Sequence, residues 1–163
     1  MTPVNIDPPL RYAGAAVTLA EVPEEISLTV SITNCRFRCH GCHSAYLQED
    51  AGRPLLPDLD ALIGRYAGLI TCVCLMGGDG DPTGVKRIAR FLHTQRTTPV
   101  KVGWYSGRSE LPEGFSTEGI EYLKLGPYIE KLGGLRAPTT NQRLYKVDPG
   151  GSLRDITHRF RRQ

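Results

Sequence analysis

The order of its apolar segments constrains the fold of this chain more than any other feature. Residues 26–33 (ISLTVSIT) are rich in β-branched side chains and contain no Gly or Pro, so they predict a buried strand. We predict further strands over 70–76, 100–105 and 120–125. In chain order, the four predicted strands run into the sequences NCRFRCHGCH, GGD, YSG and GP.

Two segments between these strands have helical periodicity. Pro57 opens the first, whose apolar residues are Leu59, Leu62, Ile63 and Tyr66, and residues 83–95 form the second. The order strand, helix, strand, helix, strand predicts a parallel sheet with helical crossovers. The carboxyl ends of parallel strands share one edge of a sheet, so we expect the four strand-end turns to build one site.

Length limits the architecture. We expect a single domain over residues 1–163, because no repeat, low-complexity tract or break in composition divides the chain. A complete (βα)8 barrel takes about 250 residues, so we predict the α/β class and a partial, open βα barrel. Residues 1–10 contain three prolines and are predicted to be an irregular arm.

Three cysteines lie close together after the first predicted strand. Cys35, Cys39 and Cys42 form a C-x3-C-x2-C array, and three thiolates on one loop can converge on one inorganic centre. A [4Fe–4S] cluster normally takes four Cys ligands, so three would leave one iron open to another molecule. A zinc site is the alternative, since His40 or His43 would complete a Cys3His tetrahedron.

The array resembles that of the radical S-adenosylmethionine (SAM) superfamily. Residues 75–82 (LMGGDGDP) resemble its GGE-type turn, and LGPYIEKLGGL followed by TTNQRLYKV resembles activating proteins of anaerobic ribonucleoside-triphosphate reductase. The likeness extends from about Arg11 to Val147, which is most of the chain. The resemblance implies the fold predicted above, a partial βα barrel.

The resemblance also implies roles for single residues. Cys35, Cys39 and Cys42 would hold a [4Fe–4S] cluster whose fourth iron binds the amino and carboxylate groups of SAM. Gly77 and Gly78 would let the backbone approach SAM. The acidic residue that receives its amino group would be Asp79 or Asp81, and we favour Asp79, which occupies the matching position. The remaining implied contact is His43 beside the adenine. Independently of the resemblance, the Ser106 hydroxyl at the end of the third predicted strand could reach the ribose or carboxylate, with a simple turn as the alternative. Where many relatives have an Asp before Gly-Pro this chain has Leu125, so the methionine carboxylate lacks an assigned partner; Lys124 is a candidate.

Together these features imply an activase. One electron given to SAM would break its carbon–sulfur bond, and the resulting 5′-deoxyadenosyl radical would take a hydrogen atom from a glycine Cα. The partner implied is the large anaerobic ribonucleotide reductase subunit that bears the glycine loop. A low-potential donor such as flavodoxin or ferredoxin would supply the electron. The NQR segment (residues 141–143) is expected to pack around the site.

Other functions remain open at this point. The chain could activate another glycyl radical enzyme, although such activases often carry extra cysteine-rich domains that it lacks. It could also be a different small radical SAM enzyme. In another class, it could be a zinc-stabilised binding module without catalysis. Cys72 and Cys74 alternate along one predicted strand and are expected to be core thiols, with a second metal site as the alternative.

The composition of the chain limits its expected cellular location and partners. Five cysteines, an odd number, argue against a disulfide framework. No apolar run approaches the roughly 18 residues of a membrane span, and the N-terminus does not resemble a signal peptide. We therefore expect a soluble, cytoplasmic protein. Arg154, Arg159, Arg161 and Arg162 gather on a helical-looking C-terminal segment, but the net charge is only +3 and no nucleic-acid motif is present, so nucleic acid is not an expected partner.

Overall fold

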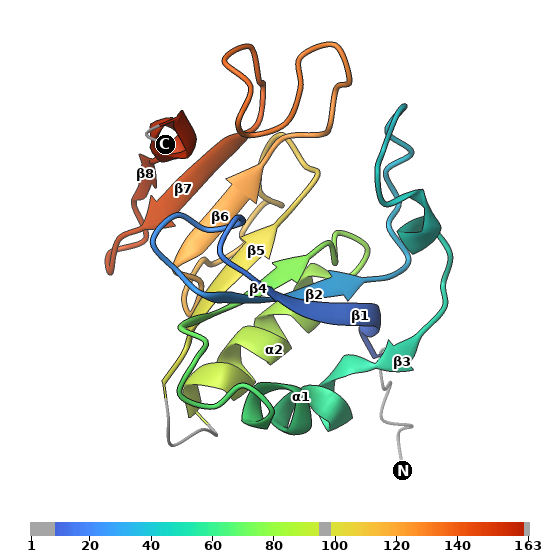
Figure 1. Cartoon of the computed structure of the whole chain (residues 1–163), viewed down its shortest axis with the longest axis vertical. Helices are drawn as coiled ribbons and strands as arrows, with labels where there is room; N and C mark the ends of the chain where they lie inside the picture. Colours follow the sequence, from blue (N-terminus) through green and yellow to red (C-terminus); the bar gives the residue numbers. More distant parts are fainter. Residues whose placement is uncertain (1–8, 95–98, 162–163) are drawn as a thin grey trace.

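One eight-stranded sheet forms the centre of the fold, with the strand order β3-β1-β2-β4-β5-β6-β7-β8 (Figure 1). The computed structural model describes residues 9–94 and 99–161. Its strands are β1 (Arg11–Thr18), β2 (Ser27–Ile32), β3 (Arg53–Pro54), β4 (Cys72–Met76), β5 (Lys101–Tyr105), β6 (Tyr122–Leu125), β7 (Arg143–Val147) and β8 (Leu153–Asp155). Its helices are α1 (Leu55–Gly64), α2 (Pro82–Thr94) and the 3-10 helices η1 (Ala45–Gln48) and η2 (Thr157–Arg161). In these two described ranges, no helix combines the length and the apolar character needed to cross a membrane.

The middle of the sheet agrees with the sequence analysis. Strands β2, β4, β5 and β6 are parallel to one another, and each lies inside one of the four predicted segments. Helix α1 connects β2 to β4, and α2 connects β4 to β5, so both predicted helices are confirmed. Helix α1 begins at Leu55, two residues before the predicted start at Pro57. The predicted end of the second helix, Gln95, lies outside the described residues.

The prediction of a partial βα barrel is wrong. The sheet is mixed, because β1 and β3 join one side of the parallel strands antiparallel and β7 and β8 join the other. Only two connections in the described chain contain an α-helix. The β5–β6 connection has Pro112 and three glycines, which disfavour a helix. Its Leu111 and Phe115 instead pack against the core that the helices cover.

The two chain ends differ from the predictions as well. The predicted C-terminal helix is a short strand, β8, followed by the single 3-10 turn of η2. Arg154 and Arg159 lie within 3.3 Å of Asp148 and Glu24, respectively, so part of the basic cluster is paired within the chain. Arg162 and most of the predicted N-terminal arm, residues 1–8, lie outside the described residues.

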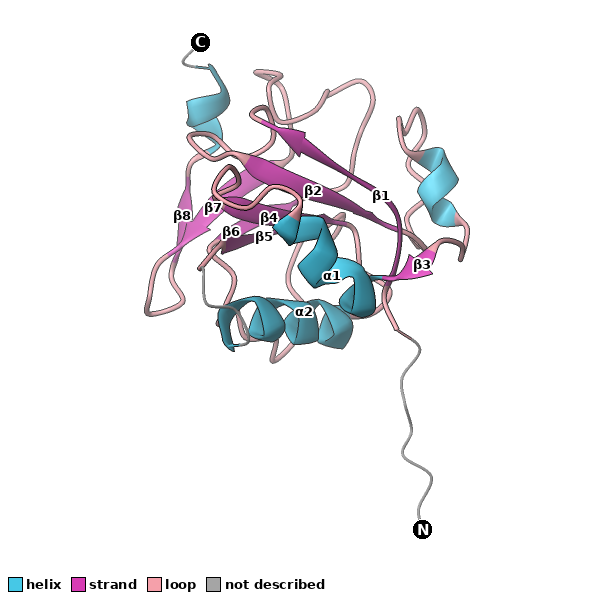
Figure 2. Cartoon of the chain, turned by 60° about the horizontal axis from the view of Figure 1, so that its bottom comes forward, coloured by secondary structure: helices cyan, strands magenta, loops and turns pink. Residues whose placement is uncertain are grey.

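Each face of the sheet has its own core. Both helices lie on one face (Figure 2), where Val73 and Leu75 of β4 pack with α1 and α2. The alternate residues, Cys72 and Cys74, point to the other face and pack with Ile156 and Phe160 from the C-terminal segment. The β1–β2 connection crosses this second face in Figure 1 and buries Val22 there. The second face continues towards the carboxyl ends of β4, β5 and β6, where it opens.

Candidate functional site

A cavity of about 560 Å³ lies at these strand ends, on the face opposite the helices. Met76, Tyr105 and Lys124 line it, and they alternate along their strands with residues of the helix-side core. The remaining lining residues are Ala20, Glu21, Cys35, Phe37, Cys39, Cys42, His43, Ser44, Leu47, Gly77, Ser106, Gly107, Tyr128, Gly134, Leu135, Arg136, Gln142 and Phe160. Residues of three of the four predicted strand-end turns therefore line one cavity, whereas Gly126 and Pro127 of the fourth do not.

All three cysteines of the array contribute to the wall of this cavity. Each thiol is free and partly buried, and burial raises the pKa of Cys35 above its ordinary value. The amide of Cys42 donates to Cys39 O at 3.2 Å, and Ser44 N donates to Cys42 Sγ at 3.4 Å, which turns the loop back on itself. Among the described residues, no three His, Cys, Asp or Glu side chains group tightly enough to hold a single metal ion.

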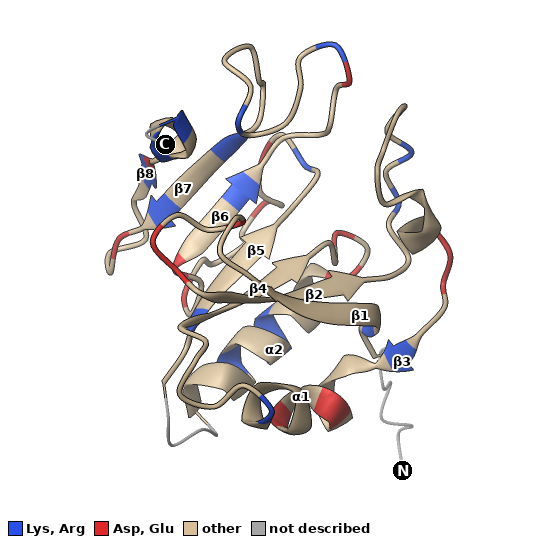
Figure 3. Ribbon diagram, in the orientation of Figure 1, with Lys and Arg blue, Asp and Glu red and all other residues tan. Residues whose placement is uncertain are grey.

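Lys124 places a buried amine in the same cavity. Its Nζ donates to Ser106 O at 2.9 Å and to Gly126 O at 2.6 Å, and it belongs to the carboxyl end of β6, which is basic in Figure 3. Burial lowers the pKa of Lys124 to about 8, although Asp79, Cys39 and Cys35 oppose that shift. An ammonium has three N–H donors, so two carbonyls leave one donor for an anionic group in the cavity. The sequence suggested Lys124 only as a candidate, because the direction of its side chain could not be read from the sequence.

Asp79 forms a bridge between two strand ends. Its carboxylate is buried and accepts hydrogen bonds from Ser106 Oγ at 2.5 Å and from Gly107 N at 2.9 Å. Arg108 adds a charge partner, with its Nε 3.6 Å from Asp79 Oδ1. Asp79 does not itself line the cavity, whereas Ser106 and Gly107 do. The Asp79 carboxylate therefore positions two residues that line the cavity. A direct contact between this carboxylate and a ligand stays a prediction.

The two glycines after β4 adopt backbone conformations that other residues avoid. The φ angles are +110° at Gly77 and +96° at Gly78. A Cβ on Gly77 would lie 3.2 Å from Ile32 O, and one on Gly78 would lie 2.7 Å from Val85 Cγ2. Trp104 Nε1 donates a hydrogen bond to Gly77 O at 2.8 Å, which holds the turn in place. Only Gly77 lines the cavity of the cysteines; Gly78 lines a second one.

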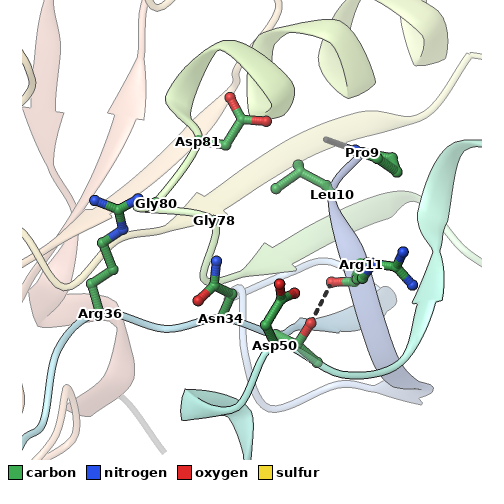
Figure 4. Close-up of a pocket in the computed structure, with 10 residues that line it drawn as sticks. Pro9, Leu10, Arg11, Asn34, Arg36, Asp50, Gly78, Gly80 and Asp81 are labelled. Atoms are coloured by element: carbon green, nitrogen blue, oxygen red, sulfur yellow. Dashed lines mark hydrogen bonds between the residues drawn. The ribbon is translucent and has the colours of Figure 1, made fainter. Parts of the chain in front are cut away.

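This second cavity, of about 130 Å³, is lined by residues from the start of β1, from the beginning of the cysteine segment and from the turn after β4 (Figure 4). Its polar lining includes Asn34, Arg36, Asp50 and Asp81, and Arg36 extends over Gly80, where a Cβ would lie 3.1 Å from Arg36 Nε. None of the five cysteines lines it. Arg36 therefore lines this cavity and not the one that the three thiols line, although the sequence places it beside them.

Of the two histidines in the array, only one faces the main cavity. The ring of His43 lines it and meets the ring of Tyr128 at a centroid distance of 5.7 Å. His40 points outward, with 95% of its side chain exposed, and its Nδ1 lies 2.8 Å from Glu130 Oε2. His43 thus lines the cavity, and its contact with an adenine stays a prediction. Tyr128 was not singled out from the sequence.

The NQR segment holds the base of the β6–β7 loop, residues 126–142. Asn141 Nδ2 donates to Pro127 O at 3.0 Å, and Gln142 is buried and lines the cavity. Arg143 is exposed at the start of β7, with Nη1 3.9 Å from Asp155 Oδ2. The expectation that this segment packs around the site is therefore met by Asn141 and Gln142 but not by Arg143.

Cys72 and Cys74 are core residues, as expected. Both have no exposed surface and belong to the cluster with Val22 and Tyr122. Burial raises the pKa of Cys72 to about 12 and that of Cys74 well above its ordinary value, so both remain thiols at neutral pH. A neutral buried thiol is a poor metal ligand.

No protein-family profile, no curated protein and no solved structure matches this chain.

Proposed function

We propose that this chain is an iron–sulfur activase that cleaves SAM reductively and generates a glycyl radical on anaerobic ribonucleoside-triphosphate reductase. One observation carries the proposal: three thiols and a buried amine line a single cavity at the carboxyl ends of parallel strands. The resemblance of the cysteine array, the GGD turn and the NQR segment to such activases adds support. The proposal depends on this site and on that resemblance, and not on the mixed sheet around the site.

The donors in the cavity suit an iron–sulfur cluster. Cys thiolates are its usual ligands, and Cys35, Cys39 and Cys42 would supply three. A zinc clip would need a fourth ligand, but His40 is bonded to Glu130 on the outside and His43 packs on Tyr128. When bound and reduced, the cluster would supply the electron that breaks the carbon–sulfur bond of SAM.

The chain's other residues would bind and orient SAM. Lys124 has one N–H donor left, and a carboxylate is the anionic group of SAM that a buried ammonium would bind. His43 and Tyr128 offer ring surfaces that would flank the adenine. Gly77 lines the site with backbone atoms alone, and Asp79 holds Ser106 and Gly107 in place. In this proposal the residue that holds the SAM carboxylate is Lys124.

The partner would be the reductase subunit that bears the glycine loop. Residues of the cysteine segment and of the β6–β7 loop both line the cavity, and these two segments extend beyond the strand ends in Figure 1, where the glycine loop of the partner would approach. A low-potential donor such as flavodoxin or ferredoxin would supply electrons. Five free thiols suit a reducing compartment, so the proposal includes a cytoplasmic location.

An anaerobic turnover assay tests this function. The protein is loaded with iron and sulfide, reduced, and mixed with SAM, and methionine and 5′-deoxyadenosine are quantified with and without the reductase. We expect slow cleavage alone, faster cleavage with the reductase, and a glycyl radical on the reductase. The Cys35→Ala variant should cleave no SAM. Consumption of a small molecule in equal amounts with SAM, without the reductase, would contradict the activase role.

A further inference from the structure

The middle of the cysteine segment touches a loop that lies far away in the sequence. Residues 34–44, here called the cysteine loop, are anchored at their start by backbone hydrogen bonds from Asn34 N to Glu49 O (3.0 Å) and from Cys35 N to Leu47 O (2.9 Å). These bonds fix the Cys35 end. The turn that carries Cys39 and Cys42 lies beyond them and faces the β6–β7 loop.

We infer that Glu130 is a positioning residue that clasps this turn. Its Oε2 lies 2.8 Å from His40 Nδ1. Its carboxyl group also fills the space beside Gly41, where a Cβ would lie 2.7 Å from Glu130 Cδ. Gly41 has a φ of +75°, so a side chain there is disfavoured by the backbone as well. Glu130 thus contacts two consecutive residues located between Cys39 and Cys42.

A second contact lies on the cavity side of the same two loops. The rings of His43 and Tyr128 meet at a centroid distance of 5.7 Å with an interplanar angle of 59°, a tilted packing typical of aromatic pairs. Glu130 and Tyr128 therefore hold the turn from two sides, one at the surface and one in the cavity wall. The Cys39–Cys42 turn lies between these contacts.

The β6–β7 loop is itself stiff enough to serve as the fixed side of the clasp. Asn141 Nδ2 donates to Pro127 O at 3.0 Å across its base. Thr139 Oγ1 donates to Leu132 O at 2.8 Å, and Gly133 N donates to Ile129 O at 3.0 Å, so internal hydrogen bonds connect its two halves. A compact loop with closed ends presents Glu130 from a defined position. The clasp would therefore fix where two of the three thiols lie.

The clasp concerns the protein without metal, and only its importance for catalysis rests on the proposed function. Thiol labelling of the metal-free full chain tests it, with site-resolved mass spectrometry of each cysteine. In Glu130→Ala we expect Cys39 and Cys42 to react roughly threefold to fivefold faster, the range that loss of one hydrogen bond allows. Cys72 and Cys74 should stay unlabelled in every variant, which reports an intact core. Lys131→Ala, one residue away and also exposed, is the matched control and should label like the wild type.

Two further variants separate the clasp from simpler causes. Removing a carboxylate can raise thiol reactivity through charge alone, but Glu130→Gln removes the charge and keeps the shape and the acceptor. We expect Glu130→Gln to label like the wild type. Gly41→Ala should displace the carboxyl group and label like Glu130→Ala. If Glu130→Gln labels as fast as Glu130→Ala, or if Glu130→Ala changes nothing, the positioning role is wrong. Neither result bears on cluster assembly, which is measured separately.

Discussion

Asp79 and Ser106 connect the turns that follow two neighbouring strands, through a hydrogen bond of 2.5 Å between Ser106 Oγ and Asp79 Oδ1. Both side chains are buried, and the carbonyl of Ser106 in turn accepts a hydrogen bond from Lys124 Nζ. A continuous chain of polar contacts thus extends from the GGD turn after β4, through the end of β5, to the amine on β6. This chain forms the strand-end wall of the cavity.

Asp79→Ala should destabilise the strand-end turns that line the cavity. The change removes the acceptor of Ser106 Oγ and Gly107 N, and hydrogen bonds to a charged group contribute about 1.5–3 kcal/mol each. We expect the free energy of unfolding, measured in urea, to fall by about 3–6 kcal/mol, against less than about 0.5 kcal/mol for the exposed Glu110→Ala. The cluster should still assemble while SAM binds more weakly. Unchanged SAM affinity by calorimetry would remove the predicted role of Asp79 towards SAM.

Two glycines with positive φ angles differ in whether a side chain would clash with a neighbouring residue. Gly78 and Gly114 have φ angles of +96° and +73°, but only Gly78 would bring a Cβ within 2.7 Å of a neighbour, Val85. We expect Gly114→Ala to lower the free energy of unfolding by about 1 kcal/mol and Gly78→Ala by about 3 kcal/mol. If chemical denaturation gives equal decreases in the free energy of unfolding for the two variants, the clash with Val85 does not contribute to the destabilisation.

Lys124 should make the stability of the metal-free protein depend on pH in a specific direction. Its pKa is lowered from 10.5 to about 8 by burial, so the folded state binds fewer protons than the unfolded state between these values. The free energy of unfolding contributed by this group therefore rises as pH increases from about 8 towards 10.5. We expect the free energy of unfolding of the wild type, relative to that of Lys124→Met, to increase by roughly 1 kcal/mol per pH unit in that window. A difference between the two proteins that is constant from about pH 7 to 10 would contradict the buried position of the amine.

The five cysteines should divide into two groups when iron is loaded. Cys35→Ala, Cys39→Ala and Cys42→Ala should each lose most bound iron and sulfide and remain folded. Cys74→Ala should keep the cluster, because its thiol is fully buried in the core and has a raised pKa. Iron and sulfide analysis, with circular dichroism as the folding control, measures both outcomes. If Cys35→Ala unfolds the chain instead, a structural zinc site becomes the better account.

Part of the fold follows from local patterns in the sequence. The four parallel strands and both helices are visible there because each carries its own signal, a β-branched run or apolar residues at helical spacing. Gly77 and Gly78 follow the end of β4, so their position at the strand-end edge is predicted too. The shared edge of parallel strands then brings the cysteines, Ser106 and Gly107 together without further information.

The other features of the fold and the site depend on contacts between segments that lie far apart in the sequence. Strand β1 (RYAGAAVT) has weak periodicity and is stabilised by its partner β2, and β8 has only three residues. These antiparallel additions turn the predicted barrel into a mixed sheet. Lys124 looks like a surface residue by type, and only the register of β6 turns it into the cavity. The contact of Gly41 with Glu130 joins residues 89 positions apart, which no local pattern indicates.

Electron paramagnetic resonance of the protein after anaerobic loading and reduction tests the central claim most directly. The account predicts the signal of a reduced [4Fe–4S] cluster, a change in that signal when SAM is added, and a weaker response to SAM in Lys124→Met. A protein that binds no cluster but holds zinc tightly, or a cluster signal that SAM leaves unchanged, would contradict it.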